Sequence, residues 1–260
     1  MESDPVLRFP SLARSLPLTL TACALYVAGC GSAGSTPSAD AASGTDAGIT
    51  VDGGASSGAD AASPTATTRF TAEAWADNWF AAYLGETLVK EDSVPITTER
   101  SFNAETFSFD AAYPFTLAVI LKDYKENDSG LEYIGKANQQ IGDGGFVLQL
   151  REATSRRLVL VTNASWKCLP IQRAPLNPTC EKDANPLATC MHESLAEPSG
   201  WKAVTFDDGA WPAAQLFTAA EVGPKEGYTT ITWDPAAKFI WSSNLKLDNT
   251  VLCRVTVSAP

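Results

Sequence analysis

His192 is the only histidine in the 260-residue chain, and it restricts the chemistry that the side chains could perform. Sites built from two or three imidazoles are excluded, and a Ser/His/Asp or Cys/His arrangement would have to use this one residue. His192 lies in the polar sequence CMHES and has no second metal ligand nearby in the sequence. We therefore expect the His192 side chain to be solvated. Most common types of hydrolytic active site are disfavoured in this chain.

Two adjacent carboxylates, Asp207 and Asp208, stand beside Gly209 and Trp211. Glycoside hydrolysis uses paired carboxylates, but these must lie about 5.5 Å or about 6.5–9.5 Å apart across a cleft. Sequence neighbours on a turn usually point apart. We favour an Asx-type turn here over a catalytic pair and assign no catalytic residue.

The polar segment 122–145 offers the best candidate for ligand binding. It joins two predicted strands, and a loop of this length inside a compact domain is usually either functional or mobile. The candidate ligand-binding residues are Tyr124 and Tyr133, for stacking, and Glu132 and Asp143, for hydrogen bonds to hydroxyl groups. A solvated loop without a ligand is the alternative.

Seven tryptophans are a high number for a domain of this size. Trp rings can serve as stacking platforms for sugars, but a Trp in a strand is more often half-buried core. We expect at most one or two of the seven to face a ligand.

The elements that must position these residues are strands. From Arg69 onward, short runs of β-branched and aromatic residues alternate with Gly, Pro, Asn and Asp, without a helical period of ten or more residues. The predicted strands cover 68–75, 78–84, 86–90, 96–102, 105–110, 115–124, 145–152, 157–168, 201–206, 228–233, 237–242 and 250–258. This pattern predicts one all-β sandwich domain over 69–260.

Four segments resemble galactose-binding-like jelly rolls. They are FTAEAWADNWFAAYLGETLVKED (70–92), GDGGFVLQL (142–150), WKAVTFDDGAWPAA (201–214) and LCRVTV (252–257). The resemblance implies a jelly-roll β-sandwich that binds carbohydrate or another envelope component. The chain departs from the pattern at Leu84-Gly85-Glu86, where an Asn-Gly turn is usual, so we expect a turn of different type or length.

The same resemblance brings in calcium, because galactose-binding-like modules often hold a structural calcium ion. The Asp77-Asn78 turn and Asp92 are the candidate ligands. A hard cation needs six to eight oxygen ligands, and the sequence displays no dedicated loop. No other cofactor is indicated.

Cysteine spacing predicts two disulfides. If Cys23 is removed with a signal peptide and Cys30 carries a lipid, four cysteines remain: Cys168, Cys180, Cys190 and Cys253. An even number of cysteines in an oxidising compartment favours disulfides. Of the three connectivities we prefer Cys180 with Cys190, which share a Pro-rich loop, and Cys168 with Cys253, which end or lie in strands. A zinc site ranks below disulfides because no CxxC spacing occurs.

The amino-terminal residues have the pattern of an export signal. Arg8 and Arg14 precede the apolar run 16–29, which is too short for a bilayer span and fits the apolar region of a signal peptide. Val27-Ala28-Gly29-Cys30 resembles the lipobox of bacterial lipoproteins, which implies cleavage after residue 29 and lipidation of Cys30. An ordinary secretory signal cut near Ala28 is the alternative.

The segment 30–68 is predicted to be a disordered tether. Between residues 31 and 67, only Ile49 and Val51 fall outside Ala, Gly, Ser, Thr, Asp and Pro, a composition that cannot offset its ordering entropy. As a flexible linker it would span about 35 Å. By resemblance, Gly31 after the lipidated Cys favours the bacterial outer membrane, with the domain facing the periplasm or exposed at the surface.

The charge balance excludes one class of partner. Nineteen Lys and Arg against thirty Asp and Glu give a net charge of -11, which argues against nucleic acid. We therefore expect a lipid-anchored envelope protein that contacts the membrane only through its anchor and binds its ligand without catalysis. The alternatives are a carbohydrate-active hydrolase or lyase that uses Asp and Glu, and a structural or assembly lipoprotein that binds proteins.

Overall fold

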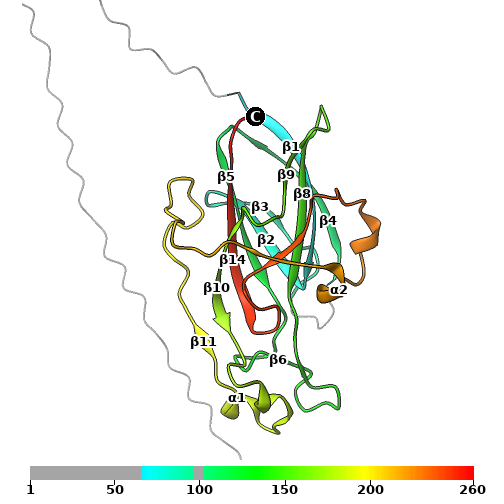
Figure 1. Cartoon of the computed structure of the whole chain (residues 1–260), viewed down its shortest axis with the longest axis vertical. Helices are drawn as coiled ribbons and strands as arrows, with labels where there is room; N and C mark the ends of the chain where they lie inside the picture. Colours follow the sequence, from blue (N-terminus) through cyan, green and yellow to red (C-terminus); the bar gives the residue numbers. More distant parts are fainter. Residues whose placement is uncertain (1–65, 97–101) are drawn as a thin grey trace, which may run out of the picture. The chain divides into compact units, whose positions relative to one another are not determined.

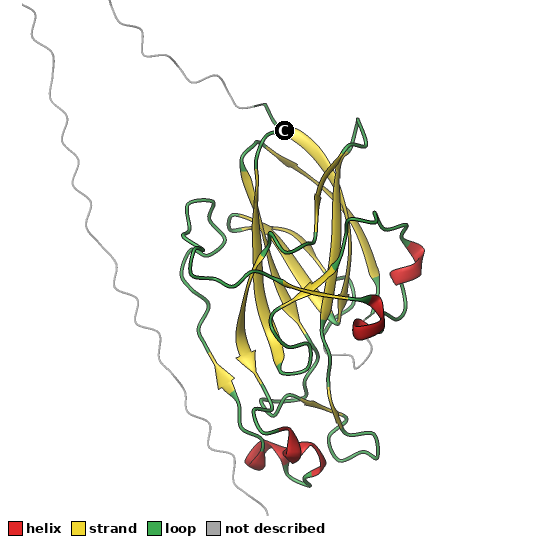
Figure 2. Ribbon diagram, viewed as in Figure 1, coloured by secondary structure: helices red, strands yellow, loops and turns green. Residues whose placement is uncertain are grey.

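Two antiparallel sheets form the folded part of the chain, and the computed structural model describes residues 66–96 and 102–260 (Figures 1 and 2). The first sheet runs in the order β12 (Gln215–Phe217), β13 (Phe239–Trp241), β8 (Gly145–Glu152), β1 (Thr68–Asp77) and β4 (Ala104–Ala111), and β9 (Leu158–Val161) also pairs with β8. The second runs β11 (Glu193–Ser194), β10 (Lys167–Arg173), β14 (Asp248–Val257), β5 (Phe115–Lys122), β2 (Trp79–Leu84) and β3 (Thr87–Glu91). The predicted all-β sandwich is confirmed.

The remaining elements are short. A hairpin pairs β6 (Leu131–Glu132) with β7 (Gln140–Ile141), and the helical turns are η1 (Pro178–Lys182), α1 (Pro186–Thr189), α2 (Ala219–Val222) and η2 (Tyr228–Thr230). The predicted signal peptide 1–29, Cys30, nearly all of the predicted linker and most of the predicted strand 96–102 lie outside the described residues.

The core lies between the two sheets and combines small with large side chains. Three alanines of β1, Ala72, Ala74 and Ala76, are fully buried. Phe80 on β2 and Phe146 on β8 belong to the same cluster and are also fully buried. Strand β4 shows the alternation expected from its sequence, with Phe107 and Phe109 inside and Thr106, Ser108 and Asp110 exposed.

Two of the predicted strands are instead loops that cover the outer faces of the sheets. Residues 201–206 form successive turns, in which Trp201 packs with Trp79 and Trp211 on the outside of the second sheet. Residues 228–233 begin with η2, and Tyr228 and Trp233 stack 5.6 Å apart in the cluster around Trp75. These two strand predictions were wrong because a loop whose aromatic side chains cover a sheet from outside has an amino-acid composition similar to that of a strand.

The predicted strand 157–168 is two strands that belong to different sheets. A turn at Asn163 separates β9 from β10. The side-chain oxygen of Asn163 accepts a hydrogen bond from the backbone N–H of Ser165, and its carbonyl oxygen accepts one from the backbone N–H of Trp166. Asn and Ser favour such Asx turns, and this one carries the chain from one sheet to the other.

Both disulfides have the pairing favoured from the sequence. Cys168 on β10 and Cys253 on β14 are register partners with Cα atoms 4.2 Å apart. Cys180 and Cys190 close the loop that contains η1 and α1. The departure at Gly85 is a two-residue turn between β2 and β3, in which Gly85 supplies a positive φ of 54°.

Candidate functional site

A polar cavity of about 260 Å³ opens at one end of the sandwich. Its wall is formed by Asp77, Asn78, Phe102, Glu132, Tyr133, Asn138, Gln140, Asp143 and Lys225. Strand β1 begins near the carboxyl terminus and runs to the end where β6 lies (Figure 1). The cavity therefore lies at the end of the domain opposite the point where the chain enters at Thr68.

Asp77 and Asp143 are brought together by the pairing of β1 with β8. Asp77 is opposite Gly145, so Asp143, two residues earlier, lies beside the end of β1. A Cβ atom on Gly144 would stand 2.4 Å from the Trp241 ring, and one on Gly145 would stand 2.5 Å from Val222. The Gly-Gly pair thus lets the backbone after Asp143 pass close to two buried side chains.

The β6–β7 hairpin supplies a second wall. Gln140 donates a 2.8 Å hydrogen bond from Nε2 to Oε2 of Glu132, its register partner. Tyr133, directly after β6, has a φ of 54°, a conformation that side chains of this size rarely adopt. Lys136 places its Nζ 5.4 Å from the centre of the Tyr133 ring.

The disulfide loop supports this hairpin from below. Gln139 donates two hydrogen bonds from Nε2, to the carbonyl oxygens of Glu181 at 2.7 Å and Asp183 at 3.0 Å. Lys182 donates from Nζ to the carbonyl oxygen of Gln139 at 2.8 Å. A small buried cluster of Leu131, Cys180 and Cys190 lies beneath the same hairpin. The Cys180–Cys190 loop therefore fixes the wall that carries Glu132 and Tyr133.

Lys225 completes the cavity from the segment after α2. Its ammonium group lies 3.7 Å from Oδ2 of Asp77 and 4.3 Å from the centre of the Phe102 ring. The backbone beside it is fixed, because the fully buried Trp75 donates a 2.9 Å hydrogen bond from Nε1 to the carbonyl oxygen of Glu226.

The carboxylates at this end are poorly solvated and close to one another. Burial raises the pKa of Asp77 well above its usual range, Lys225 opposes that rise, and the charges of Asp143 and Glu132 add to it. Burial likewise raises the pKa of the neighbouring Asp123, with further contributions from Asp77, Glu132 and Asp143. Asp77 and Asp123 are therefore two buried acidic residues near this end of the sandwich.

Three of the four carboxylate oxygens of these two residues lack the hydrogen bonds that buried carboxylates normally have; the fourth, Oδ2 of Asp123, accepts one from Nδ2 of Asn249 at 3.3 Å. Within residues 66–96 and 102–260, no donor lies in hydrogen-bond range of Oδ1 or Oδ2 of Asp77 or of Oδ1 of Asp123. Asp77 is only 1% exposed. Buried polar groups are nearly always satisfied, so each exception needs an explanation.

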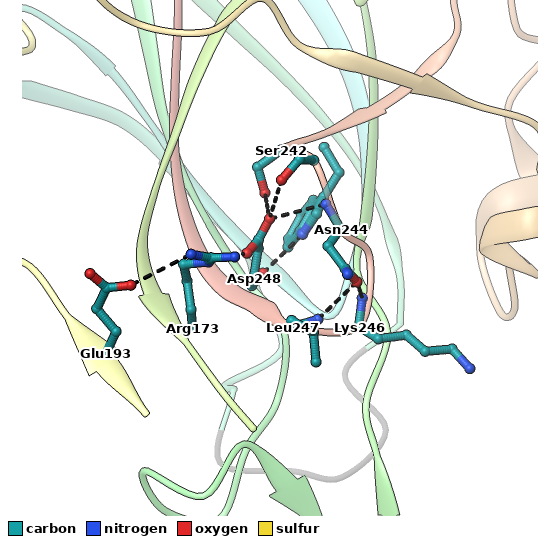
Figure 3. Close-up of polar contacts among 9 residues, drawn as sticks. Arg173, Glu193, Ser242, Asn244, Lys246, Leu247 and Asp248 are labelled. Atoms are coloured by element: carbon teal, nitrogen blue, oxygen red, sulfur yellow. Dashed lines mark hydrogen bonds and ion pairs between the residues drawn. The ribbon is translucent and has the colours of Figure 1, made fainter. Parts of the chain in front are cut away.

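Asp248 is a buried carboxylate with a purely structural role and shows the contrast (Figure 3). It is fully buried, and it accepts hydrogen bonds from Arg173 at 3.0 Å, from the Ser242 hydroxyl at 2.7 Å and from the backbone of Asn244 at 3.0 Å. Arg173 also forms an ion pair with Glu193. Asp248 holds β10 and the turn before β14 together, whereas Asp77 has one long ion pair.

Three of the four predicted ligand-binding residues, Glu132, Tyr133 and Asp143, line the same cavity. Tyr124 lies instead on a neighbouring cavity of about 550 Å³, together with Asp123 and Gln172. The backbone N–H of Tyr124 donates a 2.6 Å hydrogen bond to Oδ1 of Asn78, which ties the start of the loop to the turn after β1.

The two residues proposed as calcium ligands by resemblance have different surroundings. Asp77 lines the cavity, whereas Asp92 accepts a hydrogen bond from the backbone of Val94 and has Glu105 and Lys90 as its charged neighbours. Burial raises the pKa of Asp92 to about 7. In the part of the chain that the structure describes, no group of three or more His, Cys, Asp or Glu residues is arranged to hold a metal.

Phe102 and Lys225 are the cavity residues that sequence reasoning missed. Phe102 is the last residue of the predicted strand 96–102, and Lys225 lies far along the chain in a segment without a motif. No local pattern places either residue beside Asp77. Phe102 comes there because β4 pairs with β1, with Trp75 opposite Ala104, and Lys225 because the 217–237 segment packs on the first sheet.

The other candidate groups have structural partners. Oδ1 of Asp207 accepts a 2.9 Å hydrogen bond from the backbone of Gly209, so the predicted Asx turn is confirmed. Asp208 forms an ion pair with the buried Arg254. His192 is exposed, as expected. Six of the seven tryptophans are buried, and Trp233 is half-buried.

Comparisons of the chain with family models, with curated proteins and with solved structures give no match in any of the three cases. The resemblance to galactose-binding-like domains and to lipoproteins therefore stays a prediction. Among the described residues, no helix has the length and apolar character needed to cross a membrane.

Proposed function

We propose that the sandwich domain binds a carbohydrate, or another hydroxyl-rich component of the cell envelope, in the cavity at the end of β1, without catalysing a reaction. The observation that supports this proposal most is at Asp77. This residue is part of the cavity wall, and neither of its buried carboxylate oxygens has a hydrogen-bond donor among the described residues. A ligand with hydroxyl donors would supply these bonds.

The remaining walls suit the same class of ligand. Sugar hydroxyl groups donate to carboxylates, and the apolar faces of sugar rings pack on aromatic rings. The cavity offers Glu132 and Asp143 as acceptors and the rings of Phe102 and Tyr133 as apolar surfaces. Its volume of about 260 Å³ is slightly below the range of about 300–1,000 Å³ for ligand sites, which suits one sugar unit of a longer chain.

The sequence before the domain supports presentation of this site away from a lipid surface. We propose lipidation at Cys30 of the Val27-Ala28-Gly29-Cys30 motif and a tether up to residue 68 in the bacterial outer envelope. The domain begins at Thr68, at the end opposite the cavity. A domain attached through that end can present its cavity toward the compartment.

A glycan array tests the proposal. The full chain carrying Cys30→Ser would be applied, since this change removes the proposed lipid and leaves the domain intact. We expect binding to a restricted set of glycans, weakened by Asp143→Asn and by Tyr133→Ala. If no glycan binds and the chain captures only proteins, the structural or assembly alternative is supported instead.

One observation favours a second candidate, a glycoside-cleaving enzyme. Burial raises the pKa of Asp77, as is typical of a general acid, and the carboxylates of Glu132 and Asp143 lie on the same cavity. Incubation with each bound glycan, followed by mass spectrometry of the products, separates the two functions. Release of shortened glycans that stops with Asp77→Asn would establish the enzyme, and intact glycans would support simple binding.

A further inference from the structure

The cavity carries more negative than positive charge. Three carboxylates, Asp77, Glu132 and Asp143, line it, and Lys225 is the one cationic residue among the residues of its wall in the described part of the chain. Asp123 adds a further buried carboxyl group whose charge interacts with that of Asp77. Burial of uncompensated charge is unfavourable, so a ligand with positive charge would gain more from this cavity than a neutral one.

Lys225 shows which kind of cation fits. Its ammonium group lies between the Asp77 carboxylate, at 3.7 Å, and the face of the Phe102 ring, at 4.3 Å from the centre. A carboxylate combined with an aromatic face is a favourable environment for an ammonium ion. The Lys225 side chain is 43% exposed, whereas Asp77 is 1% exposed. Asp77 is therefore buried and Phe102 is half-buried, and the group that now contacts both is the ammonium of a long side chain that reaches in from the surface.

We infer that the cavity recognises an amino sugar with a free, protonated amine, and that the Lys225 ammonium group occupies the place of that amine in the unliganded protein. This inference rests on the proposed carbohydrate-binding function. The ligand's amine would lie between Asp77 and Phe102 and displace Lys225 toward solvent. Its hydroxyl groups would donate to Glu132 and Asp143, and its ring would pack on Tyr133.

The same charges discriminate against other ligands. A sugar with a carboxylate would face three carboxyl groups and one cation, Lys225, in the cavity wall. An N-acetylated sugar lacks the positive charge that compensates them. A polyamine provides the charge but no hydroxyl donors and no ring for Tyr133, so it should bind more weakly than an amino sugar.

Calorimetric titration of the full chain carrying Cys30→Ser tests this ranking, at about pH 6, where the amine is protonated. The probes are the trimers of glucosamine, N-acetylglucosamine and galacturonate, with spermidine and calcium chloride as separate probes. We expect the glucosamine trimer to bind at least about tenfold more tightly than the N-acetylglucosamine trimer, because charge-assisted hydrogen bonds are stronger than neutral ones.

Two variants and one control locate the effect. Asp77→Asn removes the carboxylate given to the amine, so it should weaken glucosamine binding by about tenfold and change binding of the N-acetylated trimer little. Asp110→Asn removes the same charge from an exposed position on β4, where Asp110 pairs with Arg69, and should change neither. Lys225→Met removes the competing ammonium group and should tighten glucosamine binding.

The outcomes separate this inference from the proposed function. Equal or tighter binding of the N-acetylated or galacturonate trimer would overturn the inference and leave carbohydrate binding in place. If spermidine binds as tightly as the glucosamine trimer, the site is a general cation site and the inference is overturned. The same follows if only calcium binds and Asp143→Asn abolishes that binding. Loss of glucosamine binding in Lys225→Met would exclude the role given to Lys225. If no saccharide binds, both proposals fail.

Discussion

At the scale of single residues, Asp92 makes the stability of the domain depend on pH. Its pKa rises from 3.8 to about 7 because the carboxyl group is buried. The native protein then holds this proton more tightly than the unfolded chain does. The contribution of Asp92 to the free energy of unfolding is therefore largest below about pH 4 and is lost as the pH rises toward about 7.

Asp92→Asn should flatten this part of the stability profile. Chemical denaturation between about pH 4 and about pH 7 would show a smaller loss of stability with rising pH than in the unchanged protein. Asp110→Asn serves as the control, because Asp110 is exposed and its ion pair with Arg69 contributes little. An identical pH slope in the Asp92 variant would contradict the assignment.

Tyr133 and Tyr124 form a matched pair for testing the cavity. Both are half-buried and both lie in the 122–145 connection, but only Tyr133 lines the cavity at the end of β1. Tyr133→Ala should weaken glycan binding by about 1 kcal/mol, roughly fivefold, through loss of stacking. Tyr124→Ala should leave the affinity unchanged. Affinity would be measured by calorimetry and folding by melting temperature; the reverse order of effects would move the site to the neighbouring cavity.

At the scale of elements, the two disulfides have separate tasks. Cys168–Cys253 spans 85 residues and joins two core strands, whereas Cys180–Cys190 spans 10 residues and supports the β6–β7 hairpin. A chain-entropy treatment gives about 4.6 kcal/mol for the first and about 2.7 kcal/mol for the second.

Removal of Cys180–Cys190 by paired Ser substitutions should therefore affect binding more than folding. We expect a smaller fall in the denaturation midpoint than for the Cys168–Cys253 pair, together with weaker glycan binding, because Glu132 and Tyr133 lose their support. Binding that is unaffected by loss of this disulfide would show that the hairpin is held in place without it.

The element scale also explains what the sequence could predict. Alternation in β4 and the Gly-Gly entry of β8 are local signals, so the sandwich and three of the cavity residues, Glu132, Tyr133 and Asp143, were accessible from sequence. Lys225 and Phe102 were not, because they reach Asp77 through packing between distant segments. Residues 201–206 were misread because outward-packing aromatics such as Trp201 have the composition of a strand.

At the scale of the whole molecule, the proposed lipid anchor predicts membrane association that depends on one residue. In a bacterial expression host, the unchanged chain should fractionate with membranes and the Cys30→Ser chain should not, because the segment 31–67 has no Lys or Arg to hold it at a lipid surface. Mass spectrometry of the mature terminus should find a diacylglyceryl group on Cys30. A mature chain that begins at a residue other than 30 would contradict the lipobox interpretation.

The central claim is that the cavity at the end of β1 is the binding site, and amide hydrogen exchange with a bound glycan tests it most directly. The exchange rates of the full chain carrying Cys30→Ser would be compared with and without the tightest-binding trimer. We predict slower exchange in the segments 131–133, 138–143 and 225–227, which surround the cavity. Slower exchange confined to 122–127, around the neighbouring cavity, or no change at the end of β1, would contradict the account.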